Sequence, residues 1–202
     1  MTCARALNDR IRREGTANLL EACRGAGVRR YVHQSLAFLV GGSSDIVDEA
    51  APLLPANKVT ASAIDAERLV AGSGLDWVIL RDGALYGPGT GREEQWRALA
   101  RAGELRFPGD GSDYISLIHV ADLAEGFTLA AERGPSGSIV SVVEGQPTTY
   151  RELFAYIALM EDAAVPTGGG ASNFPSFRVA NSKARDILGW RPFYRSYRSG
   201  LT

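Results

Sequence analysis

Apolar and polar positions alternate with two different periods along this chain. Between Asn8 and Ala26 the apolar positions recur every three or four residues, which predicts a helix. Its apolar face comprises Ile11, Gly15, Leu19, Ala22 and Ala26. A glycine on that face indicates close approach to a sheet or a ligand. Gly27 ends the helix, and the following letters RRYVHQS predict a short buried strand.

The alternation of helix and strand continues through the middle of the chain. Residues 36–56 are rich in Gly, Ser, Asp and Pro, which predicts a loop. A second helix is expected from Asn57, with an apolar face made by Val59, Ala63, Ala66 and Val70. The chain then continues with a strand DWVIL, a turn-rich loop DGALYGPGTG and a helix REEQWRALARAG.

The second half follows the same order of elements. The pattern predicts a strand ISLIHV, a helix from Ala121 to Arg133, a strand SIVSVV and a helix from Tyr150 to Met160. Thr149 and Glu152 have the spacing of a capping box. A short helix after Asn181 ends at Gly189. Strands that alternate with helices predict an α/β fold, a partial Rossmann-like parallel sheet with flanking helices.

The amino-acid composition excludes some classes of binding partner for this protein. The formal net charge is −1 over 202 residues, so nucleic acid is an unlikely ligand, and the apolar runs fall short of a membrane span. Cys3 and Cys23 form no C-x-x-C pair, and we expect two reduced thiols and a cytoplasmic protein.

Several site motifs are missing. The two histidines, His33 and His119, have no acidic or cysteine neighbours at ligand spacing, so we expect no metal site. No G-x-S-x-G elbow occurs. Every candidate for G-x-G-x-x-G fails at its third glycine, and neither Lys58 nor Lys183 belongs to a P-loop.

Four segments carry a family resemblance. They are EGTANLLEACRGAGVRRYVHQS, GLDWVILRDGALYGPG, FPGDGSDYISLIHVADLAEGF and NSKARDILGWRPFYRSYRSGL. In this order and spacing the chain resembles the extended or atypical short-chain dehydrogenase/reductases, the NAD-dependent epimerase/dehydratase family.

The resemblance implies the organisation of the chain. Residues 1–202 look like a single NAD(P)-binding Rossmann-like domain that is N-terminally incomplete, the C-terminal two-thirds of such a protein. Segments 84–120 and 144–202 resemble parts of the substrate lobe, including a small C-terminal extension. The implied cofactor is NAD or NADP, although the glycine-rich turn that grips it in relatives is not in this chain. We expect a small-molecule ligand and, if the first strands are absent, a homo-oligomer through an exposed sheet edge.

Three positions bear on the family's chemistry. In relatives a tyrosine acts as acid and base, a lysine four residues later lowers its pKa, and a serine or threonine orients the substrate. Alignment on the family segments places these roles on Val59, Ala63 and Leu36. No Y-x-x-x-K motif exists anywhere in the chain, so the usual hydride-transfer machinery is missing.

The resemblance also selects candidate site residues. Ser35, Arg81 and Gly83 are the candidates for cofactor contact, although Asp82 replaces the proline of the family's Arg-Pro-Gly. Tyr86 and His119 are the candidates for substrate contact. Each has a structural alternative: Ser35 as a loop cap, Tyr86 as core, and His119 as the strand–helix junction. Ile115 stands where many relatives carry an arginine for a nucleotide-sugar phosphate, which disfavours that substrate class.

Three functions stay open on the sequence. The first is an epimerase/dehydratase-like protein that is catalytically impaired. The second is an NAD(P)-binding atypical reductase or cofactor sensor whose native chain is longer. The third is a partner-binding subunit without enzymatic activity.

Overall fold

A three-stranded parallel sheet forms the centre of the computed structural model, which describes residues 3–171 and 174–201. The strand order is β1-β2-β7, with β1 at Arg30–Leu36, β2 at Asp76–Asp82 and β7 at Ser138–Val142. Arg30 lies opposite Asp76 and Leu36 opposite Asp82, so the carboxyl ends of β1 and β2 meet at one edge. The predicted α/β class with a parallel sheet is confirmed.

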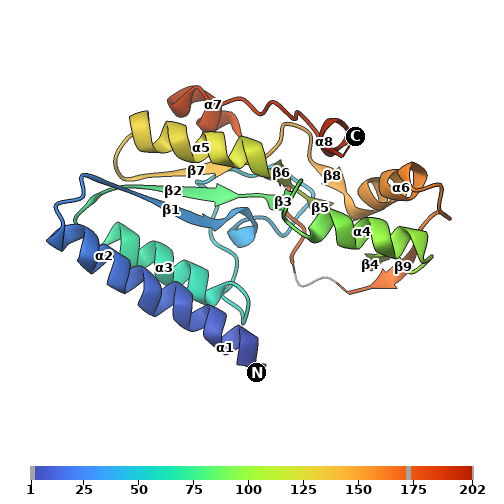
Figure 1. Ribbon diagram of the computed structural model, residues 1–202, viewed down its shortest axis with the longest axis horizontal. Helices are drawn as coiled ribbons and strands as arrows, with labels where there is room; N and C mark the ends of the chain where they lie inside the picture. The colour runs from blue at the N-terminus through green and yellow to red at the C-terminus, as the bar shows by residue number, and fades with distance from the viewer. Residues whose placement is uncertain (1–2, 172–173, 202) are drawn as a thin grey trace.

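Helices cover both faces of this sheet (Figure 1). The helices α2 (Thr16–Gly25) and α3 (Ala61–Ala71) lie on one face, and α5 (Val120–Arg133) and α7 (Ser182–Leu188) lie on the other. Alternate residues of β2 divide between the two faces, as strand geometry requires. Ile79 packs with Leu20 and Val70, whereas Val78 and Leu80 pack with the α5 side.

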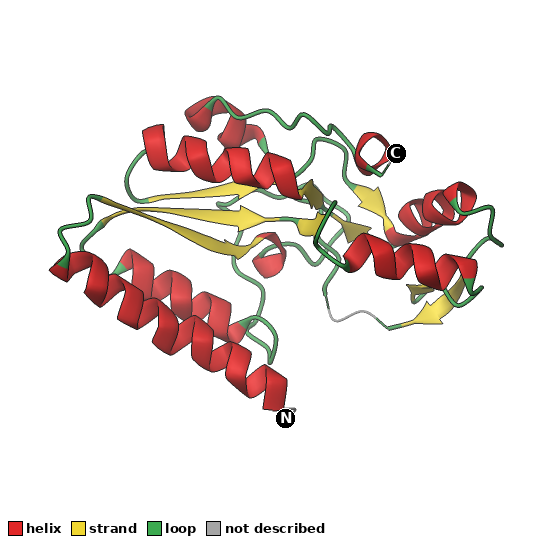
Figure 2. Cartoon of the chain, in the orientation of Figure 1, coloured by secondary structure: helices red, strands yellow, loops and turns green. Residues whose placement is uncertain are grey.

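Short strand pairs and three further helices extend the molecule beyond the carboxyl ends of the sheet (Figure 2). The pairs are β3 (Ala84–Tyr86) with β6 (Leu117–His119), β4 (Arg106–Pro108) with β9 (Thr167–Gly170), and β5 (Tyr114–Ile115) with β8 (Thr148–Thr149). The helices are α4 (Arg92–Arg101), α6 (Tyr150–Met160) and the short C-terminal α8 (Tyr197–Gly200). These elements come from the two segments that resemble a substrate lobe, and that role stays a prediction.

The N-terminal helix differs from its prediction. It consists of α1 (Cys3–Arg10), one π-helical turn and α2. The predicted core face is wrong: Ile11 is 59% and Leu19 56% exposed, and the buried residues are Thr16 and Leu20. A Cβ on Gly15 would meet only Ile11 of its own helix, so no described part of the sheet approaches there. The apolar stripe indicated one possible packing face of α2, but α2 contacts α3 through the adjoining face, which carries Thr16 and Leu20.

The edges of the central sheet bear on association. Within the described residues β1 pairs only with β2, so its other edge is unpaired. Pairing of that edge with a second copy stays a prediction.

Cys23 is a half-buried free thiol, and the side chain of Cys3 lies outside the described part. No described helix is both long enough and apolar enough to span a bilayer.

Candidate functional site

A buried ion pair lies beneath the carboxyl ends of β1 and β2. Arg81 donates from Nε and Nη2 to the two carboxylate oxygens of Glu67, at 2.9 and 2.7 Å. Ser35 donates its hydroxyl to the same carboxylate at 2.5 Å. All three residues are at most 6% exposed. The structure therefore brings the predicted cofactor residues Ser35 and Arg81 together, but it gives both a partner on α3.

The three positions assigned to the family's serine, tyrosine and lysine also lie near α3. Ala63 is 4% exposed and packs with Leu39 and Ile64, and Leu36 packs against this cluster. Leu36 and Val59 both pack against the main core. Because all three side chains are hydrocarbon, they offer no group that could donate or accept a proton.

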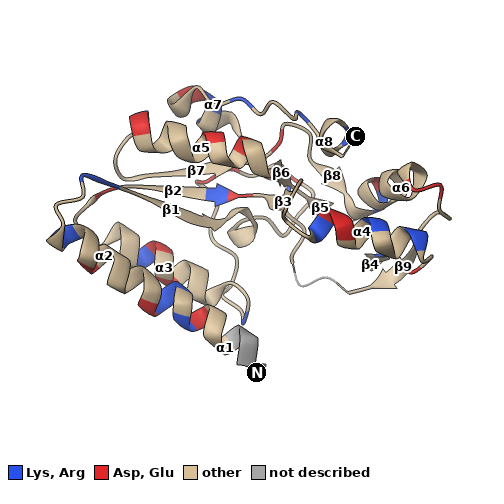
Figure 3. Cartoon of the chain, viewed as in Figure 1, with Lys and Arg blue, Asp and Glu red and all other residues tan. Residues whose placement is uncertain are grey.

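Two buried polar atoms at the end of β2 have no partner among the described residues: Arg81 Nη1 and Asp82 Oδ1 (the charged end of β2 is visible in Figure 3). The other oxygen of Asp82 accepts a hydrogen bond from Gln34 at 3.2 Å. Burial raises the pKa of the Asp82 carboxyl to about 7, against the opposing effect of the Gln34 bond. An unsatisfied buried donor and acceptor at the carboxyl end of a parallel strand are what a bound polar ligand would satisfy. Contact of a nicotinamide cofactor with this end of β2 stays a prediction.

Gly83 has a steric role. A Cβ there would lie 2.7 Å from the carbonyl oxygen of Ser116 and 2.9 Å from backbone atoms of Leu117. The backbone at Gly83 packs directly against the start of β6, which pairs parallel with β3, so only glycine allows the approach. The predicted cofactor contact of Gly83 stays a prediction beside this packing requirement.

The predicted substrate residues lie in a buried polar cluster. Tyr86 is fully buried and donates its hydroxyl to Glu144 at 3.3 Å. His119 is 5% exposed, accepts the Ala121 N–H on Nδ1, and lies with its ring centroid 3.8 Å from that of Tyr194. The rings of Tyr86 and His119 meet edge to face at 5.3 Å. Contact of Tyr86 or His119 with a substrate stays a prediction.

Sequence reasoning missed the acidic member of this cluster. Glu144 is 1% exposed, and its Oε1 has no partner within the described residues. Burial raises its pKa to about 8. Desolvation also lowers the pKa of His119. A glutamate directly after the apolar letters SIVSVV was the signal that could have drawn attention to it.

An aromatic hollow of about 380 Å³ lies between α4, α6 and the strand β4. Its lining includes four aromatic residues, two arginines and one glutamate: Trp96, Tyr150, Phe154, Phe174, Arg92, Arg106 and Glu104. The Arg92 guanidinium lies 5.7 Å from the Trp96 ring and 5.9 Å from the Phe174 ring. Sequence analysis did not single out these residues, because they come from three separate segments. We call this cavity the α4 hollow.

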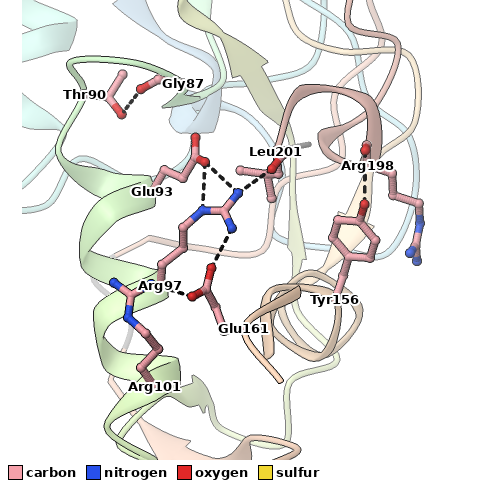
Figure 4. Close-up of polar contacts among 9 residues, drawn as sticks. All are labelled: Gly87, Thr90, Glu93, Arg97, Arg101, Tyr156, Glu161, Arg198 and Leu201. Carbon is pink, nitrogen blue, oxygen red and sulfur yellow. Dashed lines mark hydrogen bonds and ion pairs between the residues drawn. The ribbon is translucent and has the colours of Figure 1, made fainter. Parts of the chain in front are cut away.

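An arginine network holds the wall of the α4 hollow in place (Figure 4). Arg97 on α4 pairs with Glu93 at 2.9 Å, pairs with Glu161 at 2.6 Å, and donates to the carbonyl of Leu201. Arg101 pairs with the second oxygen of Glu161. The network joins α4, the end of α6 and the C-terminal segment.

The parallel sheet and the helices on both of its faces define a Rossmann-like α/β protein. The model of the NAD dependent epimerase/dehydratase family matches residues 7–142. The chain belongs to this family.

Two curated relatives match most of the chain. The 3-diazoavenalumate denitrifying reductase of a Streptomyces species is 36% identical over 214 residues, covering 95% of this chain and 70% of the relative. The 4-hydroxy-2-methyl-3-oxo-4-farnesyl-3,4-dihydroquinoline-1-oxide ketoreductase of Stigmatella aurantiaca is 31% identical over 202 residues, covering 95% of this chain and 59% of the relative.

Solved structures agree with the fold. DesIV, a dTDP-glucose 4,6-dehydratase from Streptomyces venezuelae solved with NAD and TYD bound, has a TM-score of 0.87 and 26% identity, covering 98% of this chain and 65% of that chain. This chain therefore spans between 59 and 70% of the length of these three proteins.

Proposed function

We propose that this protein binds a small aromatic anion in the α4 hollow and is impaired in the hydride transfer typical of its family. The observation that carries the proposal is the α4 hollow itself, in which aromatic faces and two guanidinium groups surround about 380 Å³. Aromatic walls favour a flat ring, and Arg92 and Arg106 favour a carboxylate or phosphate beside it. The hydrocarbon side chains at positions 36, 59 and 63 support the loss of the family's proton relay.

The test is a fluorescence titration with cinnamate, a flat aromatic carboxylate, and with cinnamyl alcohol as its neutral match. Cinnamate should quench tryptophan emission with saturation, and cinnamyl alcohol should bind at least tenfold more weakly. Trp96→Phe should remove most of the quenching. Arg106→Gln should weaken binding about tenfold, as expected for one charge-assisted contact, while Arg29→Gln, an exposed arginine outside the hollow, should leave it unchanged. Equal binding of acid and alcohol, or no saturation, would refute the proposed ligand class.

A second candidate is an atypical NAD(P)-dependent reductase, favoured by the names of the two relatives and by Asp82. A reduced nicotinamide cofactor supplies a hydride when bound. Asp82 holds a proton near neutral pH because burial raises its pKa to about 7, and it is this chain's candidate for the accompanying proton.

Binding of NADPH separates the two candidates. If Asp82 contacts the cofactor, its ionisation should repel the cofactor's charge, so the NADPH affinity measured by nicotinamide fluorescence should fall between pH 6 and pH 8. Asp82→Asn should abolish this pH dependence, and Glu144→Gln should retain it. A folded chain that does not bind NADPH, or an Asp82→Asn variant with the same pH dependence, would reject the reductase candidate.

A further inference from the structure

A second cavity, of about 370 Å³, lies beyond the carboxyl end of β7, and we call it the arginine pocket. It is formed by the turn after β7, the start of α7 and the segment that leads to α8. Its lining residues are Gly145, Gln146, Asn181, Arg185, Arg191, Pro192 and Arg195. Three of these seven are arginines and none is acidic, in a chain whose net charge is −1. Figure 3 shows Lys and Arg positions along the connection from α7 to α8.

The guanidinium groups of this pocket are free of protein partners. In the described part of the chain, Arg185, Arg191 and Arg195 make no ion pair and no side-chain hydrogen bond, whereas Arg81 and Arg97 are both paired with carboxylates. Three like charges around one hollow repel each other, and no carboxylate is among the residues that line it. Such a cluster favours an anionic occupant.

The segment that carries two of the arginines is firmly held. The Asp122 carboxylate accepts the backbone N–H of Phe193 at 2.8 Å and of Tyr194 at 3.0 Å. Trp190, fully buried, donates its indole N–H to the Asp122 carbonyl at 3.0 Å. These bonds fix the backbone between Arg191 and Arg195 against α5. A fixed backbone lowers the entropy that ordering the two side chains around a ligand would cost.

The opposite wall is also fixed. Asn181 is 7% exposed and donates its amide to the Val143 carbonyl at 2.8 Å. Arg185 lies one helical turn after Asn181, and its N–H donates to the Asn181 carbonyl at 3.2 Å. Gly145 leaves room in front of this wall, because a Cβ there would meet no atom closer than 3.9 Å.

We propose that the arginine pocket binds the phosphate or diphosphate group of a small metabolite. Guanidinium groups match phosphate oxygens with paired N–H donors, and Gln146 adds a polar group at the rim. The lining has no aromatic residue, so the pocket suits a phosphate group rather than a nucleobase. The feature is a compact hollow that opens to solvent and not a long basic stripe, which argues against nucleic acid as the occupant. This site is separate from the α4 hollow and does not depend on the function proposed there, since the two cavities share no lining residue.

The test is isothermal titration of the full chain with inorganic pyrophosphate at constant ionic strength. We expect saturable one-to-one binding, weaker binding of orthophosphate and none of chloride. Arg191→Gln and Arg195→Gln should each weaken pyrophosphate binding at least tenfold. Arg29→Gln removes the same charge from an exposed position outside the pocket, and it should change the affinity less than twofold.

Circular dichroism would show that each variant is folded, and thermal unfolding gives a second measurement. Pyrophosphate should raise the melting temperature of the parent chain and of Arg29→Gln, but not that of the double variant Arg191→Gln/Arg195→Gln. Failure of pyrophosphate to saturate would overturn the proposal. So would an equal loss of affinity in Arg29→Gln, because it would indicate attraction by overall charge and not by the pocket. Binding of polyuridylate oligonucleotides in preference to pyrophosphate would also overturn it.

Discussion

Individual buried charges determine much of the chemistry of this protein. Glu67 and Arg81 form a bidentate pair with side chains 7% and 4% exposed. Removing one member of a buried pair leaves the other charge without compensation, which costs more than the pair itself contributes.

We therefore predict that Glu67→Leu lowers the free energy of unfolding by about 3–5 kcal/mol. The double variant Glu67→Leu/Arg81→Met should lose clearly less than the sum of the two single variants. Urea unfolding followed by circular dichroism measures both. Additive losses would mean that the two side chains are not coupled.

Glu144 gives a pH dependence at the same scale. Burial raises its folded pKa from an ordinary 4.5 to about 8. Between these values the folded state holds a proton that the unfolded state has lost, so this group makes the free energy of unfolding fall as pH rises and adds no further change above about pH 8.

Glu144→Gln removes this contribution. The stability of the variant relative to the parent should rise by on the order of a few kcal/mol between pH 5 and pH 8. Urea midpoints at several pH values would show it. A constant difference between the two proteins would mean that the carboxyl titrates normally.

At the scale of elements, one glycine lets the connection from β2 to β3 pack against the start of β6. Gly83→Ala should lower the free energy of unfolding by about 1–3 kcal/mol, because the new Cβ would lie 2.7 Å from the Ser116 carbonyl oxygen. Gly25→Ala is the matched control: it lies in α2 with no atom within 4 Å of its Cβ, and it should be neutral or slightly stabilising. Thermal unfolding compares them, and equal shifts would contradict the steric role of Gly83.

Periodicity in the sequence predicted most of the elements. The capping box at Thr149 and Glu152 and the end of α7 at Gly189 are as predicted, because short-range hydrogen bonds and backbone preferences determine them. The short pairs β4–β9 and β5–β8 were not predicted, since two- to four-residue strands depend on partners far away in the chain.

For the whole molecule, the Arg97 network joins regions that are distant in sequence. Arg97→Met should lower the free energy of unfolding by about 1–3 kcal/mol, because it removes the ion pairs of Arg97 with Glu93 and Glu161. The Arg97 side chain is only 21% exposed, so water screens these pairs little. Arg10→Met, which breaks an exposed pair with Glu14 at 3.9 Å, should change it by less than about 0.5 kcal/mol. Chemical unfolding of both variants tests this, and an equal loss in the two would contradict it.

Sequence reasoning could predict the family, because the family segments depend on residue identity at fixed spacing, whereas the loss of the family's proton relay at positions 36, 59 and 63 stays a prediction. It could not predict that Ser35 and Arg81 would both donate hydrogen bonds to Glu67. Nor could it predict that separate segments would form the α4 hollow and the arginine pocket. Such features depend on which side chains meet in three dimensions.

The C-terminal segment also constrains how this chain folds during synthesis. A Cβ on Gly200 would lie 2.4 Å from the Tyr86 hydroxyl, so α8 rests directly on the core residue that contacts Glu144. A chain made from its N-terminus can pair β1 with β2 early, but it cannot cover Tyr86 until residues near 200 have left the ribosome. A nascent chain stalled before α8 would therefore keep this tyrosine and its buried carboxyl partner open to water and to chaperones.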